Sequence, residues 1–198
     1  MKISIFADLH INTGTYGGSD KDGLTFRMRD FMDAFKWGVT KNIEEIKPDA
    51  VAILGDIYDH PHPPSNIQRF FNSQIRRLNK AGIAVHIVVG NHDACKLHHA
   101  IEPLEGIELP NVFVYYTPKI VKLGDKGPDL FIFPHTERVE RREISMRDAF
   151  VETVKEWIPE IKRCKEEGRQ SLLFGHFPIR GAYKSDAAAN MADDDVRC

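Results

Sequence analysis

Short apolar runs that lead directly into polar residues give this chain its pattern. The clearest is 83–93, IAVHIVVGNHD, in which the run stops at Gly90 and is followed at once by Asn91, His92 and Asp93. Short, nearly continuous apolar runs are typical of buried strands. The same design recurs at 3–10, which ends in Asp8 and His10, at 50–56, which ends in Gly55 and Asp56, and at 171–176, which ends in Gly175 and His176.

Helical periodicity lies between the runs at 3–10 and 50–56, and again between those at 50–56 and 83–93. Apolar residues recur every three or four positions in two segments, and this predicts two helices that pack one face on a sheet. Pro48 is expected to close the first helix after Lys47, whereas Ser65 is expected to be the N-cap of the second and Gly82 its C′ residue. The apolar residues are Met28, Phe31, Phe35, Val39, Ile43 and Ile46 in the first helix, and Ile67, Phe71, Ile75 and Leu78 in the second.

The second half of the chain predicts a further sheet region. Segments 112–116 and 119–123 have strand character, and a turn with two glycines returns the chain into a strand at 129–133, which indicates antiparallel pairing. A short helix is expected around 99–104. Residues 12–23 contain four glycines among polar side chains and predict a surface loop beside the end of the first strand.

A further helix is expected before the last apolar run. Ser145 followed by Asp148 has the spacing of a capping box. Pro159 lies further along the same apolar periodicity and is expected to kink or restart the helix. The apolar residues of this segment are Ala149, Phe150, Val154 and Trp157. The alternation of strands and helices indicates the α/β class.

Composition narrows the class of protein but not the substrate. The chain has 198 residues, 42% of them hydrophobic, and a formal net charge of −2, so one domain over 1–198 is expected and no global basic field indicates nucleic acid. The three cysteines are odd in number and widely spaced, and Met1 and Lys2 lead directly into a strand. A reducing cytoplasm is expected, and no apolar run approaches the roughly 20 residues that span a bilayer.

The polar residues at the strand ends have the chemistry of a metal site. Carboxyl ends of neighbouring strands meet at one edge of an α/β sheet, so these side chains are expected to converge. Carboxylate, amide and imidazole groups suit Mn²⁺, Fe or Zn²⁺ better than Ca²⁺ or Mg²⁺. Each motif taken alone is more often ordinary turn chemistry. All four occur at the ends of apolar runs and in a fixed order, and this favours a metal site.

The ordered set of D-x-H, GDxxD, GNHD and a strand-terminal histidine resembles the calcineurin-like metallophosphoesterase superfamily. The resemblance spans residues 8–176 and implies a four-layer α/β/β/α sandwich with mixed sheets and two divalent metal ions, with Mn²⁺ the expected metal. It implies the following metal ligands: Asp8 and His10 at the first metal, Asp56 as the bridge, and Asn91 and His176 at the second.

The same resemblance assigns roles to three further residues. His92 would lie near the scissile phosphate and stabilise or protonate the leaving oxygen, and Asp93 would orient it. Asp59, the second aspartate of GDxxD, would contact the metal ligands without binding metal itself. A positioned imidazole acting as general acid contributes about 10² to 10⁴ in rate.

Within the superfamily, several segments look most like the SbcD-type DNA repair nucleases, including phage exonuclease subunits. This implies a Mn²⁺-dependent DNA exo- and endonuclease that works with an SbcC-type ABC ATPase. Basic residues could contact DNA phosphates, but the favoured interpretation is that they lie on solvated faces of helices or loops. They are Arg69, Arg76, Arg77 and Lys80, and Arg138, Arg141 and Arg142. The segments are KISIFADLHI, GDIYDHPHPP, FIFPH and SLLFGHFPIRGAY.

Other functions stay open at this point. One is a phosphomonoesterase or small-molecule phosphodiesterase of the same superfamily, because the metal motifs are shared. Another is a noncatalytic subunit or relic that keeps the fold. Whether the protein forms a homodimer is also open.

One departure from the superfamily pattern bears on all of these functions. The superfamily completes its metal set with G-H-x-H, whereas this chain has Gly175-His176-Phe177-Pro178 and no later histidine. In the favoured explanation His176 is a separate, earlier ligand and the domain is truncated before G-H-x-H. In the alternative His176 belongs to a degraded G-H-x-H and His135 supplies the middle ligand. Either explanation leaves the site incomplete.

The remaining histidines are interpreted without a function. His86 alternates with core residues of a strand and is expected to be an interior or half-buried histidine with its hydrogen bonds satisfied. His98 and His99 are expected on an exposed helix or loop, and His60 and His62 on a proline-rich surface loop.

Overall fold

The computed structural model describes residues 1–11, 18–19, 21, 23–95, 98–105, 108–125, 127–135 and 145–177. Most of the glycine-rich loop predicted at 12–23 lies outside these residues. So do the basic residues predicted at 138–142 and the chain after Phe177, with its departure from G-H-x-H.

Parallel strands make up the first sheet. Its order is β1-β2-β3-β6, and every neighbouring pair runs parallel. The bounds are Ile3–Phe6 for β1, Ala50–Leu54 for β2, Ala84–Val88 for β3 and Val112–Tyr115 for β6. The expectation that 112–116 belongs to an antiparallel sheet is wrong. This strand pairs with β3 because the chain crosses from β3 to the far edge of the first sheet before entering the second.

The second sheet is mixed. Its order is β7-β8-β9, with β7 antiparallel to β8 and β8 parallel to β9. The bounds are Lys119–Lys122 for β7, Asp129–Phe133 for β8 and Ser171–Gly175 for β9. The predicted hairpin at 119–133 is therefore confirmed, and so is the strand before His176.

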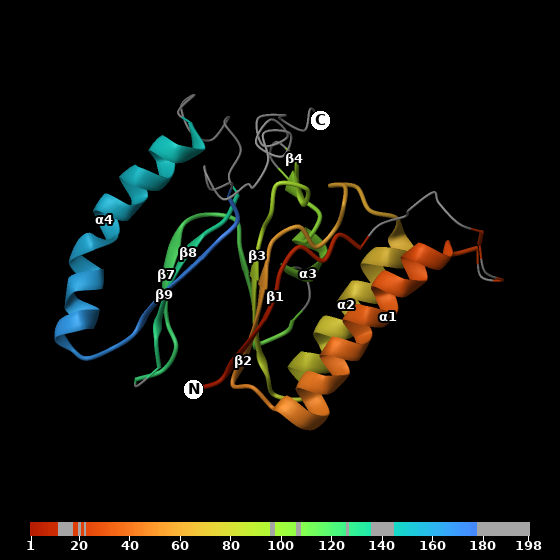
Figure 1. Cartoon of the computed structure of the whole chain (residues 1–198), viewed down its shortest axis with the longest axis horizontal. Helices are drawn as coiled ribbons and strands as arrows, with labels where there is room; N and C mark the ends of the chain where they lie inside the picture. Colours follow the sequence, from red (N-terminus) through yellow and green to blue (C-terminus); the bar gives the residue numbers. More distant parts are fainter. Residues whose placement is uncertain are drawn as a thin grey trace, which may run out of the picture.

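Helices cover the outer faces of both sheets (Figure 1). Helices α1, Phe26–Lys41, and α2, Ser65–Lys80, pack on the first sheet, and α4, Met146–Glu166, packs on the second. The layers follow the order α/β/β/α, so the predicted fold class is confirmed. Small elements complete the list: the π-helix η1 Asn42–Ile46, β4 Ala94–Cys95, β5 His98–His99 and α3 Glu102–Glu105.

The last turn of the first predicted helix and the N-cap of the second differ from the sequence predictions, although the first helix ends at Lys47 as predicted. The first helix closes in the π turn η1, which alters the helical phase, and Ile46 is 39% exposed instead of buried. Ser65 is the first helical residue and not the N-cap. Pro64 takes the cap position, and its carbonyl accepts hydrogen bonds from the backbone of Ile67 and Gln68.

The other predicted helix ends agree with the structure. Gly82 has φ +76° as the C′ residue of α2, and Ile83 N–H bonds to Leu78 O, as in a Schellman motif. Ser145 caps α4, and its Oγ accepts a hydrogen bond from Asp148 N–H at 3.1 Å. Helix α4 runs through Pro159 without restarting.

His98 and His99 lie in β5, which pairs with β4, and not on a helix or loop. The His99 ring stacks on Tyr116 with the centroids 5.3 Å apart. The short helix predicted around 99–104 is found as α3. Among the described residues, no helix is long and apolar enough to cross a membrane.

His86 lies between the two sheets and is 3% exposed. Its Nδ1 lies 2.9 Å from Tyr115 Oη, but its Nε2 has no hydrogen-bond partner among the described residues. The interior location agrees with the sequence prediction, whereas the expected satisfaction of both nitrogens is wrong. Burial lowers the pKa of His86 to about 4.

This pKa makes stability depend on pH. Between pH 6.5 and 4 the unfolded state binds a proton at His86 that the folded state does not, so the free energy of unfolding falls as pH falls. His86 alone is expected to remove about 2 kcal/mol between pH 7 and pH 5. Urea unfolding at both pH values measures this, and His86→Phe is expected to show a loss smaller by that amount. An identical loss in both proteins would contradict the prediction.

Candidate metal centre

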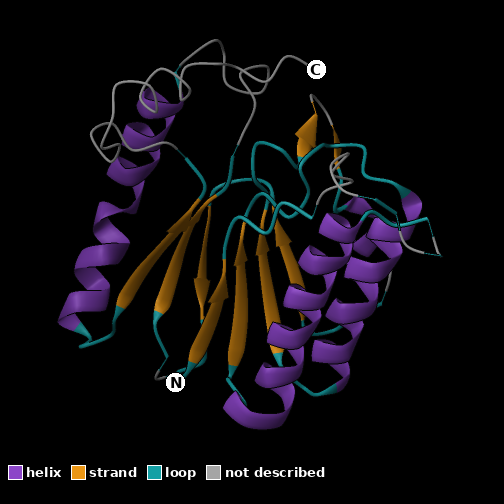
Figure 2. Ribbon diagram, turned by 45° about the vertical axis from the view of Figure 1, so that its right-hand side comes forward, coloured by secondary structure: helices purple, strands orange, loops and turns teal. Residues whose placement is uncertain are grey.

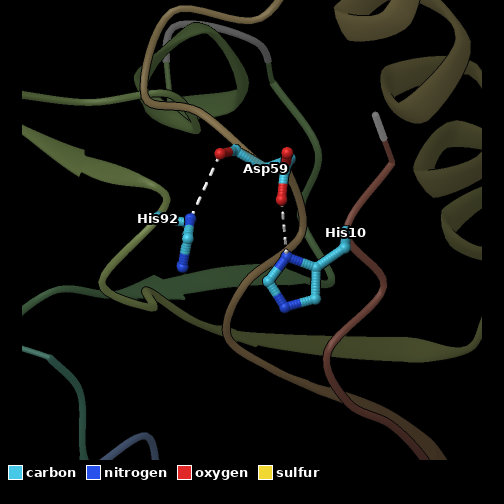
Figure 3. A group of neighbouring side chains, drawn as sticks. All are labelled: His10, Asp59 and His92. Carbon is cyan, nitrogen blue, oxygen red and sulfur yellow. Dashed lines mark hydrogen bonds and ion pairs between the residues drawn. The ribbon is translucent and has the colours of Figure 1, made fainter. Parts of the chain in front are cut away.

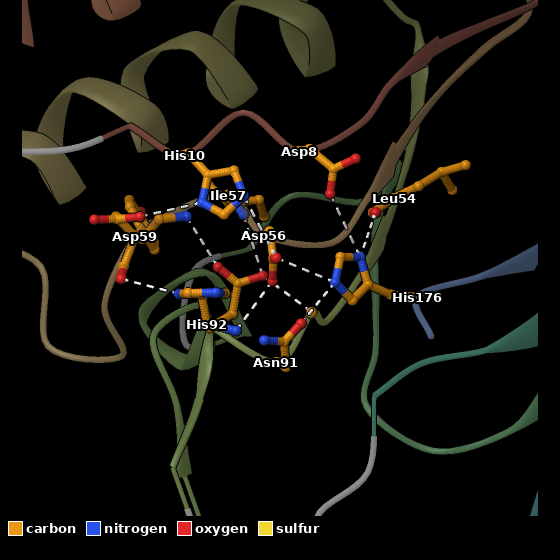
Figure 4. Close-up of polar contacts among 12 residues, drawn as sticks. Asp8, His10, Leu54, Asp56, Ile57, Asp59, Asn91, His92 and His176 are labelled. Atoms are coloured by element: carbon orange, nitrogen blue, oxygen red, sulfur yellow. Dashed lines mark hydrogen bonds and ion pairs between the residues drawn. The ribbon is translucent and has the colours of Figure 1, made fainter. Parts of the chain in front are cut away.

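The carboxyl ends of four strands meet at one edge of the sandwich (Figure 2). Residues that follow β1, β2, β3 and β9 converge there (Figure 4). Backbone hydrogen bonds join the strand ends: His10 N–H donates to Asp56 O at 2.9 Å, and His176 N–H donates to Phe133 O at 3.2 Å. The predicted ligands Asp8, His10, Asp56, Asn91 and His176 all lie at this edge.

Backbone conformation sets these residues apart. Asp8, His10 and Asp56 have φ of 49°, 41° and 47°, in the left-handed region that side chains with a Cβ seldom adopt. Among the described non-glycine residues only Lys47, at the end of a helix, shares this sign of φ. Such strain costs about 1 to 3 kcal/mol per residue and concentrates at functional sites.

Two glycines make room for the centre. A Cβ at Gly90 would overlap the amide nitrogen and Oδ1 of Asp56, and a Cβ at Gly55 would overlap Nδ1 of His176. Gly55 also has φ +78°. The ends of β2 and β3 therefore approach each other at a distance that only glycine permits.

Asp56 lies at the middle of the group and is 5% exposed. Its Oδ2 is 3.2 Å from Nε2 of His176 and 3.6 Å from Nε2 of His10, and its Oδ1 accepts a hydrogen bond from His92 N–H at 3.0 Å. Burial alone would raise the pKa of Asp56, but the hydrogen bond and the charge of His176 and the bond from His92 bring it below its usual value. The carboxylate therefore stays ionised.

His176 faces a second set of oxygen atoms. Its Nε2 lies 2.8 Å from Asn91 Oδ1, and its Nδ1 lies 3.1 Å from Leu54 O and 3.9 Å from Asp8 Oδ1. Ligand atoms of Asp8, Asp56 and His176 lie within 4.8 Å of one another, a separation that one metal ion can bridge. Burial would lower the pKa of His176, but the hydrogen bond to Asp56 and the negative charge of Asp56 raise this pKa above its usual value.

A neighbouring group consists of His10, Asp59 and His92 (Figure 3). Asp59 Oδ1 lies 3.3 Å from His10 Nδ1, and Asp59 O lies 3.1 Å from His92 Nδ1. The two rings meet edge to face with centroids 5.1 Å apart. Asp59 thus contacts both histidines, one through its side chain and one through its backbone. The sequence placed Asp59 behind the ligands but gave no sign of this double contact.

The contacts of Asp93 differ from the role that the resemblance implied. It is fully buried, and its carboxylate accepts hydrogen bonds from the backbone N–H groups of Ile57 at 3.3 Å, Tyr58 at 3.0 Å and Gly90 at 3.0 Å. Burial raises its pKa to about 6, although these three bonds oppose the shift. The expectation that Asp93 orients the His92 ring does not match this geometry, because Asp59 O contacts that ring. Asp93 instead fixes the loop that carries Asp56.

His135, the alternative middle ligand, belongs to neither group of candidate ligands in the described part of the chain. Its backbone N–H donates to Val89 O at 2.9 Å and so joins β8 to the end of β3. His176 is the histidine that reaches Asp56 and Asn91.

A family model for the calcineurin-like phosphoesterases matches residues 1–196. The chain belongs to this family. The predicted enzyme class, a metal-dependent phosphoester hydrolase, is confirmed by this family membership.

Several curated relatives of this calcineurin-like phosphoesterase chain are DNA repair proteins or nucleases by name. The DNA double-strand break repair protein Mre11 of Sulfurisphaera tokodaii is 26% identical over 95% of the chain and 45% of its own length. A subunit of the nuclease SbcCD from Staphylococcus epidermidis is 24% identical over 94% of the chain and 49% of its own length. The chain thus spans about half the length of these relatives. A dimetal phosphatase structure from Danio rerio matches 46% of the chain and 29% of its own, with 22% identity and a TM-score of 0.32.

The donor groups at the centre fit the divalent metals that the family uses. Carboxylate oxygens, an amide oxygen and imidazole nitrogens converge there, and neither group of candidate ligands among the described residues contains a cysteine. Such a mixed N and O set suits Mn²⁺, Fe or Zn²⁺ and does not choose among them.

Proposed function

We propose that this chain carries the catalytic half of a DNA nuclease that hydrolyses phosphodiester bonds with two divalent metal ions. The observation that carries the proposal is the convergence of Asp8, His10, Asp56, Asn91 and His176 on strained, glycine-framed strand ends. Family membership supports the reaction class, and the names of the Mre11 and SbcCD relatives support DNA as substrate.

In this proposal Asp56 would be a ligand to both metal ions. Its carboxylate lies between the imidazoles of His10 and His176, at 3.6 Å and 3.2 Å, so it borders both halves of the centre. Asp8 and His10 would be ligands on the first side, although Asp8 Oδ1 also lies 3.9 Å from His176 Nδ1. Asn91 and His176, whose polar atoms lie 2.8 Å apart, complete the second. When bound, a pair of such ions supplies an attacking hydroxide and a clamp for the phosphate.

His92 would transfer a proton to the leaving oxygen. With Nδ1–H donating to Asp59 O at 3.1 Å, its Nε2 is available to the substrate. Asp59 has the accompanying task of holding His10, through the 3.3 Å contact to Nδ1, so that Nε2 of that ring faces Asp56. Asp93 serves as a positioning residue, because it fixes the backbone on either side of the centre.

The finer parts of the proposal rest on the resemblance to the SbcD-type nucleases. Mn²⁺ is the expected metal, DNA the substrate, and an SbcC-type ABC ATPase the partner. The name of the relative, a subunit of the nuclease SbcCD, supports a nuclease that works with another subunit. A cytoplasmic location agrees with Cys95 and Cys164, which are free thiols. That residues 1–198 form one domain belongs to the proposal too. Homodimer formation stays open.

The test compares two substrates and one matched pair of variants, all with Mn²⁺. Wild type with Mn²⁺ is expected to degrade end-labelled duplex DNA faster than it hydrolyses p-nitrophenyl phosphate. His92→Gln is expected to lower the DNA rate by about 10² to 10⁴ while Mn²⁺ affinity stays within about threefold. His98→Gln serves as the control, because His98 is exposed and belongs to neither group of candidate ligands among the described residues; it is expected to leave the rate unchanged.

Three outcomes would contradict parts of this proposal. Preference for the p-nitrophenyl ester over DNA would favour a phosphomonoesterase. Calorimetric titration that detects no Mn²⁺ binding would favour the noncatalytic relic. Unchanged Mn²⁺ binding in His176→Ala would overturn the assignment of His176 as a ligand.

A further inference from the structure

A second hollow lies at the opposite end of the strands from the metal centre, where β1, β2 and β3 begin. We call it the inter-sheet cavity; its volume is about 570 Å³, and its walls include Ala50, Ala84, His86, Tyr115, Val121 and Leu123. The first four belong to the first sheet, and the other two belong to the second sheet and its hairpin. Cavities of about 300 to 1,000 Å³ are the usual size of small-molecule sites.

The sequence explains why space is left between the sheets. Ala50 and Ala84 are direct partners in the β2–β3 register and face the second sheet side by side. Sheets pack about 10 Å apart when larger side chains fill the gap. Two adjacent alanines cannot fill it, and Gly124 and Gly127 on the opposite wall add no side chain.

Aromatic rings form one wall of the inter-sheet cavity. The His86 ring lies nearly parallel to Phe113, with centroids 5.2 Å apart and 20° between planes, and to Tyr115, at 5.9 Å and 4°. Phe113 is 43% exposed and also lines the cavity. Part of this side chain is therefore accessible to a molecule in the cavity, and aromatic rings favour stacking with a planar partner.

An unsatisfied polar atom lies in the same wall. Nε2 of His86 is buried and has no hydrogen-bond partner among the described residues, whereas Nδ1 is engaged by Tyr115 Oη. A buried polar atom without a partner costs about 1 to 3 kcal/mol, and a ligand that bonds to it recovers that cost. The charged residues among the walls, Asp49 and Lys122, have opposite signs and so favour no net ligand charge.

We propose that the inter-sheet cavity binds an uncharged planar heteroaromatic molecule that stacks on the ring wall and hydrogen-bonds to His86 Nε2. This site is separate from the metal centre and independent of the proposed nuclease activity. The space beside Ala84 sets the size of the ligand, and His86 sets its polarity.

Indole and indene make a matched pair of probes, because they share shape and only indole carries an N–H group. In ¹H–¹⁵N NMR titrations of wild type, indole is expected to shift residues of β3, β6 and β7 saturably and to bind about tenfold more tightly than indene. His86→Phe is expected to abolish that difference. Ala84→Leu is expected to weaken both probes at least tenfold by filling the cavity.

Ala34→Leu is the control for the added volume, because Ala34 is exposed on α1. It is expected to bind both probes as wild type does. The proposal is overturned if wild type shows no saturable shift up to the solubility limit of indole, or if the shifts map away from β3, β6 and β7. Equal affinity of wild type for the two probes would remove His86 from the site. Because the wild-type titration is decisive alone, misfolding of a variant leaves the test intact.

Discussion

Asp56→Asn is expected to lower Mn²⁺ affinity at least 100-fold and to remove hydrolytic activity with it. The carboxylate is 5% exposed and borders the imidazoles of both His10 and His176. An amide of the same shape keeps the bond from His92 N–H but loses the charge that would hold two cations. Loss of a residue that only supports ligands already costs about 10- to 100-fold in metal affinity, so loss of a shared ligand costs more.

Isothermal titration with MnCl₂ measures this effect directly. Asp129→Asn is the matched control, because Asp129 is also a buried aspartate, paired with Arg169 and Cys164 at the far end of the second sheet. It is expected to lower the melting temperature but to leave the Mn²⁺ isotherm in place. If both variants bind Mn²⁺ as wild type does, Asp56 is no ligand and the two-metal proposal fails.

The sequence alone predicts that strands end near four polar residues, and the reason is physical. These residues are Asp8, Asp56, Asn91 and His176. A buried parallel strand has to be apolar almost throughout, so polar residues can begin only where the strand ends. Parallel strands end at the same edge of a sheet, and the sequence therefore predicts both the elements and the convergence of their ends.

Local sequence could not supply contacts that depend on tertiary structure. Asp93 follows His92 directly, and the resemblance to the superfamily implied that it orients the imidazole. The fold turns its carboxylate inward to backbone groups of the loop after β2, a contact across 35 residues. The choice of sheet for Val112–Tyr115 was hidden in the same way, because an apolar strand has no local mark of its partner.

Gly90→Ala is expected to have the largest effect on stability of any single methyl group added to the centre. Its Cβ would overlap the backbone nitrogen and Oδ1 of Asp56, and the carbonyl carbon of Gly55 lies at 3.0 Å. Backbone atoms cannot rotate away as a side chain can, so the ends of β2 and β3 must separate. Overpacking of this kind costs about 1 to 3 kcal/mol, and separation would also weaken the bond from Gly90 N–H to Asp93.

Comparison with Gly168→Ala separates this clash from the general cost of replacing a glycine. Gly168 has φ +69° and open space around the position of a Cβ, so alanine there costs about 1 kcal/mol through backbone strain alone. Urea unfolding is expected to show a larger loss for Gly90→Ala, and Mn²⁺ titration is expected to show weakened binding for that variant only. Gly90→Ala leaves every candidate metal ligand in the sequence. A loss of Mn²⁺ affinity in this variant would therefore come from the displaced strand ends. Equal losses of stability with unchanged Mn²⁺ binding would mean that the close approach of Gly90 to Asp56 does not set the geometry of the centre.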